Sequence, residues 1–252
     1  MVLSYRQLTS SVKQKIFTAF QEGMECREIP RYLHVSDRAV RRVLQEAGIN
    51  TKRRNRYQLD ETYFDVIDSE IKAYLLSLMA ADGCVTSTNY IVYDSVESSL
   101  VTLLKDELKY QENIRIIYFP QGYAPHYRLN FSSQTIARAL TKYGVVAGRT
   151  ESGVYYLPDD QYLGSYLLGY FDGDGCAYVN QGRSGGLVYL VGSKPWVQAL
   201  QDRLKMGKLL QHISRSVYYC WRIYSREDIQ KFYNLLYLYQ IPNLGLAYLQ
   251  EI

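Results

Sequence analysis

Two Asp-Gly pairs at equivalent places in the sequence carry the clearest chemistry. Asp82-Gly83 ends one apolar segment, and Asp174-Gly175 ends a similar segment 92 positions later. Paired carboxylates are the ligands that hard divalent cations such as Mg²⁺ prefer. Such a cation can activate water and neutralise phosphate charge, so the pair would suit phosphodiester hydrolysis. Alternatively, each aspartate only caps its own glycine turn, but two copies at equivalent positions favour the chemical interpretation.

The aspartates belong to an internal repeat. Ala73–Cys84 matches Ser165–Cys176, and farther along Phe131-Ser132 matches Tyr224-Ser225. In each half the apolar periodicity predicts a helix, two strands, a helix, two strands and a final helix. The expected fold class is therefore α+β, with two αββαββα units related by a pseudo-two-fold axis.

Small residues at helical spacing predict how the two Asp-Gly segments meet. Gly169 and Gly173 lie four apart on one helix, and Ser77 and Ala81 hold the same places in the first copy. Small side chains let two helix backbones approach closely, so we expect these helices to pack against each other with both aspartates at the last turn. Negative charge there coincides with the negative helix ends and favours a cation. We expect Gly83 and Gly175 to end the helices as C′ residues.

The N-terminal 50 residues predict three short helices. Val12, Ile16 and Phe20 mark the first, Arg27–Leu33 the second, and a third starts after the N-cap Ser36. His34 stands in the tight turn where a left-handed residue is needed. The third helix buries Ala39, Val40, Val43, Leu44 and Ala47 and leaves outside Asp37, Arg38, Arg41, Arg42 and Gln45. This pattern resembles a helix-turn-helix unit whose third helix enters the major groove; the alternative is a generic three-helix bundle.

The N-terminal part of the chain is the basic part: residues 1–60 hold 12 Lys/Arg and 6 Asp/Glu, whereas residues 61–252 hold 17 Lys/Arg and 19 Asp/Glu. A basic segment, residues 52–56, follows the three predicted helices. Beside the three helices, this segment would contact DNA as a basic arm; otherwise it is a solvated tether or a targeting patch. Its basic residues are Lys52, Arg53, Arg54 and Arg56. The expected organisation is a helix-turn-helix domain at 1–50, a linker at 51–66, and repeats at 67–150 and 151–252.

The motif Leu167–Gly175, which reads LLGYFDGDG, resembles the signature of the LAGLIDADG homing endonucleases. The first copy, Leu75–Gly83, is degenerate, because Ser77 replaces the usual glycine and Ala80 the first acidic residue. The chain as a whole resembles a single-chain, two-repeat member of that family with an N-terminal helix-turn-helix extension.

This resemblance implies a divalent-metal endonuclease. Asp82 and Asp174 would be the catalytic metal ligands, with the backbones of Ala81 and Gly173, whereas Asp172 takes no such role. The expected ion is Mg²⁺, with Mn²⁺ as a substitute. The partner would be long double-stranded DNA, held by two curved antiparallel sheets and cut in both strands with short 3′ overhangs by a monomer. The DNA-contacting set comprises Ser36, Arg38, Arg41, Arg42, Lys52, Arg53, Arg54, Arg56, Arg128, Arg149 and Arg222.

One departure from the family keeps alternatives open. Active members usually add a central basic residue in each half; Arg149 or Lys142 could serve in the first, but residues 241–246 contain no Lys or Arg. Weak cleavage, nicking of one strand, or a DNA-binding regulator without activity would follow. An RNA maturase of introns is a third possibility. The acidic balance of residues 61–252 also requires basic residues on the sheet faces, such as Arg115, Arg128, Arg183, Arg215 and Arg222.

Composition sets the general class. Of 252 residues, 47% are hydrophobic and 21% charged, which excludes wholesale disorder. Four cysteines form no CxxC pair and only three histidines occur, so a zinc site is not expected. We expect an intracellular, cytoplasmic protein of bacterial or phage origin with reduced cysteines, an organellar location remaining open.

Overall fold

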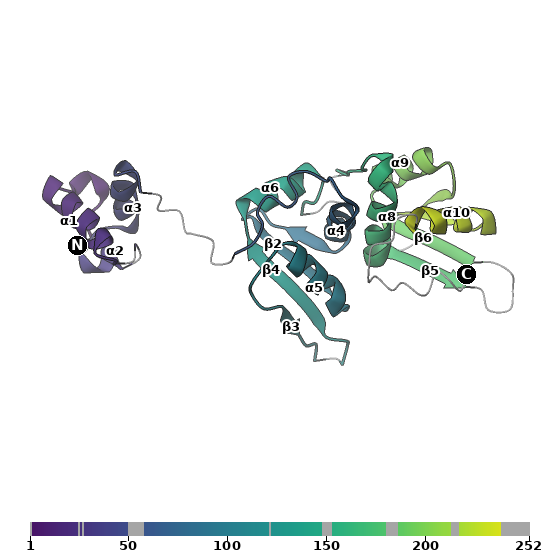
Figure 1. The fold of residues 1–252 in the computed structure, drawn as a ribbon, viewed down its shortest axis with the longest axis horizontal. Coiled ribbons are helices and arrows are strands. Elements are labelled where there is room, and N and C mark those ends of the chain that lie inside the picture. Colours follow the sequence, from purple (N-terminus) through teal and green to yellow (C-terminus); the bar gives the residue numbers. More distant parts are fainter. Residues whose placement is uncertain are drawn as a thin grey trace. The chain divides into compact units, whose positions relative to one another are not determined.

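The computed structural model describes residues 2–24, 26, 28–49, 58–120, 122–147, 153–179, 186–212 and 217–237. The chain forms two compact units, Met1–Arg56 and Tyr57–Ile252. Figure 1 shows the elements of both units.

The N-terminal unit is helical. Its elements are η1 (Tyr5–Gln7), α1 (Ser10–Gln21), α2 (Ile29–Tyr32) and α3 (Asp37–Glu46). As predicted, the Ser36 hydroxyl accepts a hydrogen bond from the Ala39 backbone N at 3.2 Å and caps α3. His34 adopts a left-handed φ of 52°, and the turn allows α3 to pack on α1 and α2.

Two details of this unit differ from expectation. The helix α2 has only the four residues Ile29–Tyr32, because Pro30 is accommodated only in a first helical turn. Ala47 was expected in the core but lies exposed beyond the last residue of α3. The other four predicted inner residues, Ala39, Val40, Val43 and Leu44, are buried.

The second unit repeats one order of elements twice, as predicted. The first half contains α4 (Glu70–Ala81), β1 (Gly83–Val85), β2 (Tyr90–Ser95), α5 (Ser98–Glu107), β3 (Arg115–Ile117), β4 (His126–Ser132) and α6 (Gln134–Lys142). The second contains α8 (Asp160–Asp174), β5 (Gly175–Val179), β6 (Gly186–Gly192), α9 (Lys194–Leu204), β7 (Lys208–Gln211), β8 (Tyr219–Ile223) and α10 (Arg226–Leu236).

Each half builds one antiparallel four-stranded sheet. The strand orders are β1-β2-β4-β3 and β5-β6-β8-β7, the same order in both halves. Helix α5 packs on β2 and β4, and α9 packs on β6, β7 and β8. Along β6, Val188 and Leu190 are buried while Tyr189 between them is not, so one face of the sheet covers the core and the other stays open.

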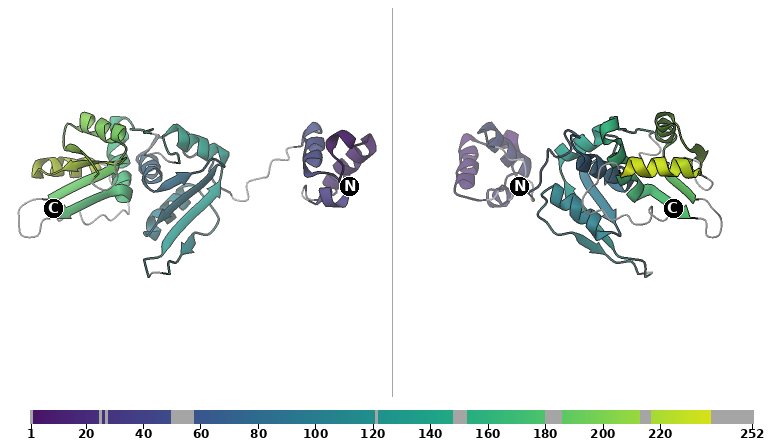
Figure 2. Two further views of the ribbon diagram at one scale, coloured as in Figure 1. Left: turned by 180° about the vertical axis from the view of Figure 1, so that it is seen from behind. Right: turned by 45° about the vertical axis from the view of Figure 1, so that its right-hand side comes forward.

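The helices α4 and α8 pack directly against each other in the middle of this unit, with one sheet on either side (Figures 1 and 2). Both helices are buried along most of their length and contribute to a hydrophobic core that the two halves share. The pseudo-two-fold arrangement expected from the repeat is therefore built around this helix pair.

Two boundaries required correction. The expected linker at 51–66 is too long, because Tyr63 and Phe64 are buried in the core of the second unit and the Tyr63 hydroxyl donates to Glu107 at 2.8 Å. The repeat alignment also shifts by one residue at the last helices. Ser133 caps α6 and Ser225 caps α10, so Ser133, rather than Ser132, corresponds to Ser225.

Candidate active site and nucleic-acid interface

The interface between α4 and α8 depends on glycine. A methyl group on Gly169 would lie 2.3 Å from the Ser77 Oγ and 2.3 Å from the backbone oxygen of Tyr74. Real Cβ atoms do not approach other atoms so closely, so only glycine fits there. Ser77 itself is fully buried and donates from its hydroxyl to Tyr74 O at 2.8 Å. The small-residue spacing read from the sequence thus lies at the place where the two helix backbones meet.

The C-terminal tips of the two helices also meet. A methyl group on Gly173 would lie 2.4 Å from the Ala81 Cβ and 2.8 Å from the Asp82 Oδ2. The Asp82 carboxylate therefore rests against the residue that precedes Asp174. Asp82 is exposed and Asp174 is half-buried, so two carboxylates from different halves come to one edge of the helix pair.

The glycines after the aspartates stand at the helix ends. Asp82 is the C-cap of α4 and Gly83 its C′ residue, as predicted, whereas Gly175 is itself the C-cap of α8. Neither Gly83 nor Gly175 is left-handed; each is the first residue of a strand, β1 or β5. A methyl group at Gly83 would lie 2.4 Å from Met79 O, and one at Gly175 would lie 2.4 Å from Phe171 O. Glycine is needed because the chain turns from helix into strand against the last helical turn, with no intervening loop.

The arrangement suits a hard divalent cation. The carboxylates of Asp82 and Asp174 supply oxygen donors, and backbone carbonyls at Ala81 and Gly173 lie in the same two turns. The negative ends of both helix dipoles add to the attraction. Within the described residues no cluster of three or more His, Cys, Asp or Glu side chains forms. Mg²⁺ usually keeps several water ligands and binds through one or two carboxylates together with phosphate oxygens.

Basic residues occupy the open sheet faces. In the first sheet, Arg128 stands directly opposite Asp94 on β2 and Arg115 on β3. The Arg128 Nε donates to Asp94 Oδ1 at 2.6 Å, and this hydrogen-bonded carboxylate raises the pKa of the guanidinium. In the second sheet, Arg222 stands opposite Lys208 and lies 5.8 Å from the ring of Tyr189.

The two sheets place these cations differently. The strand register brings Asp94 level with Asp82, one step beyond the Gly83–Tyr93 pair. The polar row is Asp94, Arg128 and Arg115 in the first sheet, and the corresponding row in the second is Val191, Cys220 and Leu210. The first half therefore carries charge level with its aspartate, whereas the second half carries uncharged residues there.

The outward face of α3 is basic, and two of its arginines form ion pairs with acidic residues of the same helix. Asp37, Arg38, Arg41, Arg42 and Gln45 line one open surface pocket. Arg41 pairs with Asp37 at 2.9 Å, and Arg42 pairs with Glu46 at 3.3 Å. Such exposed pairs are worth little in free energy, so they do not prevent either arginine from turning towards a phosphate.

Several predicted basic residues have no described position. They are Lys52, Arg53, Arg54, Arg56, Arg149, Arg183 and Arg215, together with the stretch 241–246. Lys142, the other candidate for a central basic residue in the first half, ends α6 with its Nζ 4.9 Å from the Tyr143 ring centroid.

Sequence reasoning assigned no role to Asp172, which the structure places in the interface between α4 and α8. The Tyr74 hydroxyl donates to Asp172 Oδ2 at 2.6 Å, and burial raises the pKa of this carboxyl to about 7. The only sequence signal was the mismatch between the copies, since Ala80 stands where Asp172 does.

One protein-family model matches this chain, and the match lies in the second repeat. The match covers residues 161–237, which include α8 with its Asp174 tip and the second sheet. The family model that matches these residues describes a LAGLIDADG-like domain. The first copy, whose signature is degenerate, lies outside the matched range but has the same element order around the same helix pair.

Solved structures share this LAGLIDADG fold. The I-LtrWI LAGLIDADG homing endonuclease bound to target DNA is 12% identical, with a TM-score of 0.50 over 72% of this chain and 87% of that one. The meganuclease I-AabMI bound to uncleaved DNA is 15% identical, with a TM-score of 0.47 over 67% and 83%. Full-length WhiA from Thermatoga maritima is 17% identical, with a TM-score of 0.48 over 77% and 62%. At 12% identity the likeness to I-LtrWI is one of fold, and the predicted α+β architecture is confirmed.

No curated protein sequence matches this chain. Among the helices that the structure describes, none has the length and apolar character required to cross a bilayer.

Proposed function

We propose that this protein is a site-specific, divalent-metal-dependent endonuclease that hydrolyses both strands of a long double-stranded DNA target. The observation that carries the proposal is the meeting of the two helix tips, where the Asp82 carboxylate packs against Gly173 beside Asp174. Two carboxylates, one from each repeat, lie at one exposed edge. This number matches the two phosphodiester bonds, one in each strand, that must be hydrolysed to cut a duplex. The LAGLIDADG fold, which the chain shares with a homing endonuclease bound to its DNA target, supports the same conclusion.

The residues have distinct proposed roles. Asp82 and Asp174, with the backbone carbonyls of Ala81 and Gly173, would hold Mg²⁺ or Mn²⁺. When bound, the ion supplies charge neutralisation at the scissile phosphate and a more acidic water. Because each repeat contributes one carboxylate, a single chain would cut both strands, and cuts staggered across the minor groove would leave short 3′ overhangs.

DNA would be held by both units. On the open sheet faces Arg128 and Arg222 would contact the duplex, and in the N-terminal unit α3 would enter a major groove as part of a helix-turn-helix. In that unit Ser36 and Arg38 stand at the start of α3, where side chains reach base edges and phosphates. The basic segment of residues 52–56 would add phosphate contacts between the two units.

The test is selection of cleaved sites from a random duplex pool in Mg²⁺, followed by assays on the selected site. We expect Asp82→Asn and Asp174→Asn each to abolish cutting of one strand and to leave DNA binding within about threefold, since the ion ligands are lost but the sheets are not. Full double-strand cleavage by both variants would refute the proposal.

A DNA-binding protein without nuclease activity is the second candidate. The observation that favours it is the uncharged row Val191, Cys220 and Leu210, level with Asp174 in the second sheet. The purified protein would then retain a preferred duplex from the pool but neither nick nor cut it in Mg²⁺ or Mn²⁺.

A further inference from the structure

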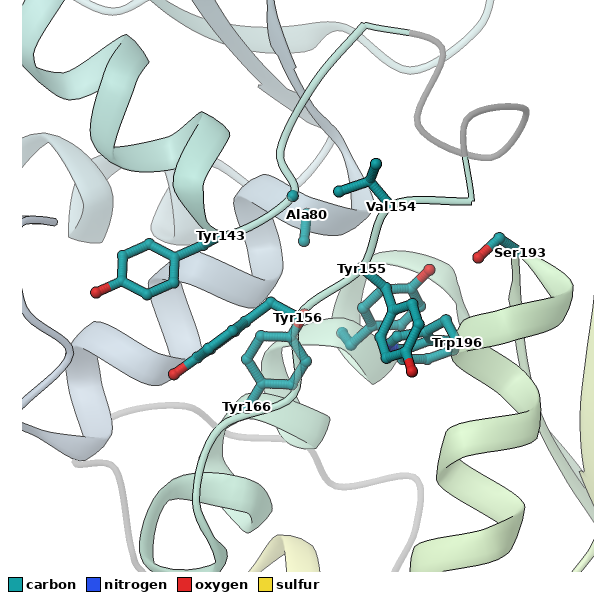
Figure 3. Close-up of a pocket in the computed structure, with 10 residues that line it drawn as sticks. Ala80, Tyr143, Val154, Tyr155, Tyr156, Tyr166, Ser193 and Trp196 are labelled. Carbon is teal, nitrogen blue, oxygen red and sulfur yellow. The ribbon is translucent and has the colours of Figure 1, made fainter.

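The enclosed space beside the central helices is too small for a ligand. It measures about 10 Å³, enough for one water molecule, and aromatic side chains such as Tyr156, Tyr166 and Trp196 line it (Figure 3). A larger ligand cannot enter this space and would instead meet the second unit at an open surface, such as the open face of the first sheet.

Arg128 on that face is held by a double hydrogen bond to a carboxylate. It stands directly opposite Asp94 in the ladder of β2 and β4, its Nε donates to Asp94 Oδ1 at 2.6 Å, and its Nη2 donates to Asp94 Oδ2. Leu129 and Phe131 of the same strand are buried, so the pair lies on the opposite, open face of the sheet. A bidentate pair of this kind fixes the plane of the guanidinium as well as its position.

The outer end of this guanidinium stays available to a ligand. Arginine carries five N–H donors, and Asp94 takes one on Nε and one on Nη2. Among the residues that the structure describes, Arg128 has no other hydrogen-bond or ion-pair partner, and its side chain is 38% exposed. The donors that remain on Nη1 and Nη2 form an outer fork. Such a fork can donate two parallel hydrogen bonds to O6 and N7 of a guanine in the major groove.

Arg115, the third residue of this row, has a different charge balance. It pairs with Arg128 in the ladder of β3 and β4, is exposed, and forms no hydrogen bond or ion pair with any described residue. Like charges directly opposite each other on a sheet are unfavourable, and Asp94 is bound to Arg128 alone. Residues 113–150 include no Asp or Glu, so no acidic residue of β3 or β4 offsets the charge of Arg115.

This difference in charge separates the ligands that the two arginines favour. A guanine edge and a phosphate can each accept two hydrogen bonds from a guanidinium. A phosphate is negatively charged, and the carboxylate of Asp94 beside Arg128 repels it, whereas the guanine edge is uncharged. Arg115 has no such carboxylate and attracts a phosphate with its full charge.

We propose that Asp94 is a positioning residue that orients the outer fork of Arg128 towards a guanine of the DNA target, whereas Arg115 beside it contacts a phosphate. The inference rests on the proposed function, since it takes duplex DNA as the ligand of the sheet face, and it deepens that function by naming a base and the residues that recognise it. The corresponding row of the second sheet consists of Val191, Cys220 and Leu210 and offers no counterpart.

The experiment is a binding profile of the full chain without divalent ions, so that no strand is cut. A preferred duplex is retained from a random pool, each of its base pairs is replaced in turn, and affinities are measured by fluorescence anisotropy. We expect replacement of one G·C pair to weaken binding about tenfold, and Arg128→Ala to abolish the preference at that pair alone.

Asp94→Asn is the decisive variant. It should reduce the preference at the same G·C pair to about threefold or less, because the second charge-assisted bond that fixes the fork is lost. Its affinity for a random duplex should not fall, because a negative charge has left a surface that faces a polyanion. Added to Arg128→Ala, it should change no base preference further, since Asp94 acts through Arg128.

Arg115→Ala is the matched control, because it removes the other arginine of the same row. It should weaken binding to all duplexes by the same factor and reduce the slope of log affinity against log salt by about 0.9, with every base preference retained. The inference is overturned if Asp94→Asn leaves the G·C preference intact. It is also overturned if Asp94→Asn weakens all duplexes equally, which is the pattern of a general structural defect.

These binding measurements separate the inference from the proposed nuclease activity. A protein that cuts both strands but whose base preferences do not respond to Asp94→Asn keeps the proposed function and loses this inference. A protein that recognises the guanine through Asp94 and Arg128 but never cuts keeps the inference and loses the nuclease. Retention of no preferred duplex would overturn both.

Discussion

Replacing Gly169 by alanine tests the helix interface on which the candidate site depends. In most helices this change stabilises, because alanine has less backbone freedom to lose on folding. Here the added methyl group would lie 2.3 Å from the Ser77 Oγ and 2.3 Å from Tyr74 O. The serine can rotate, but the backbone oxygen moves only if α4 and α8 separate. We therefore expect Gly169→Ala to destabilise the second unit.

The magnitude follows from two opposing effects. Overpacking a core costs about 1–3 kcal/mol, and a clash with backbone belongs at the upper end, about 3 kcal/mol. The gain in helix propensity returns about 0.5–1 kcal/mol. The net loss is about 2 kcal/mol, which for a unit of this size lowers the Tm by about 4–8 °C.

Thermal unfolding followed by far-UV circular dichroism measures this shift. Thr102→Ala, at an exposed position of α5, is the control: it also improves helix propensity but meets no interface, so its Tm should equal or exceed that of the unchanged protein. Ser77→Gly added to Gly169→Ala should recover part of the loss, because one of the two clashes is removed. A Tm for Gly169→Ala at or above the starting value would refute the close-packing argument.

Three further predictions concern pH, capping and DNA contact. Burial raises the pKa of Asp172 to about 7, so the folded state keeps a proton that the unfolded chain releases above about pH 4. Without divalent ions, the free energy of unfolding should therefore fall by up to about 4 kcal/mol between pH 4 and 7 and then level off. Asp172→Asn should remove this fall, which urea unfolding at a series of pH values measures. The same dependence of stability on pH in both proteins would contradict the prediction. Ser36→Ala should destabilise α3 by about 1 kcal/mol and speed hydrogen exchange of its amides several-fold, and unchanged exchange would show that the cap is dispensable. Arg38→Ala should weaken DNA binding and reduce the slope of log affinity against log salt by about 0.9 in fluorescence anisotropy, whereas an unchanged slope would exclude a phosphate contact.

Local rules explain why much of the architecture was predictable. The Ser36 cap and the left-handed His34 turn depend on residues within three positions of each other, and both occur as predicted. The element order of both halves follows from apolar periodicity in short windows. The Gly169 and Gly173 spacing already implied a close helix partner, and the internal repeat identified the other copy as that partner.

Features that join distant parts of the chain required the tertiary structure. Tyr74 and Asp172 are 98 positions apart, and no local pattern relates a tyrosine in one copy to an acid in the other. The pairing of Arg128 with Asp94 follows from strand register, which side-chain alternation alone leaves undefined.

The amino-acid sequence by itself determined the repeat, the order of helices and strands, and the two aspartates that end equivalent helices, because each of these is written in neighbouring residues. Only the tertiary structure decided what lies around those aspartates. It showed that Gly83 and Gly175 serve a direct helix-to-strand turn rather than a left-handed cap, since the obstructing atoms belong to the preceding helical turn in space. It also showed that the Tyr74 hydroxyl on α4 donates to the Asp172 carboxyl on α8, since burial and hydrogen bonding are properties of packed surfaces and not of sequence windows.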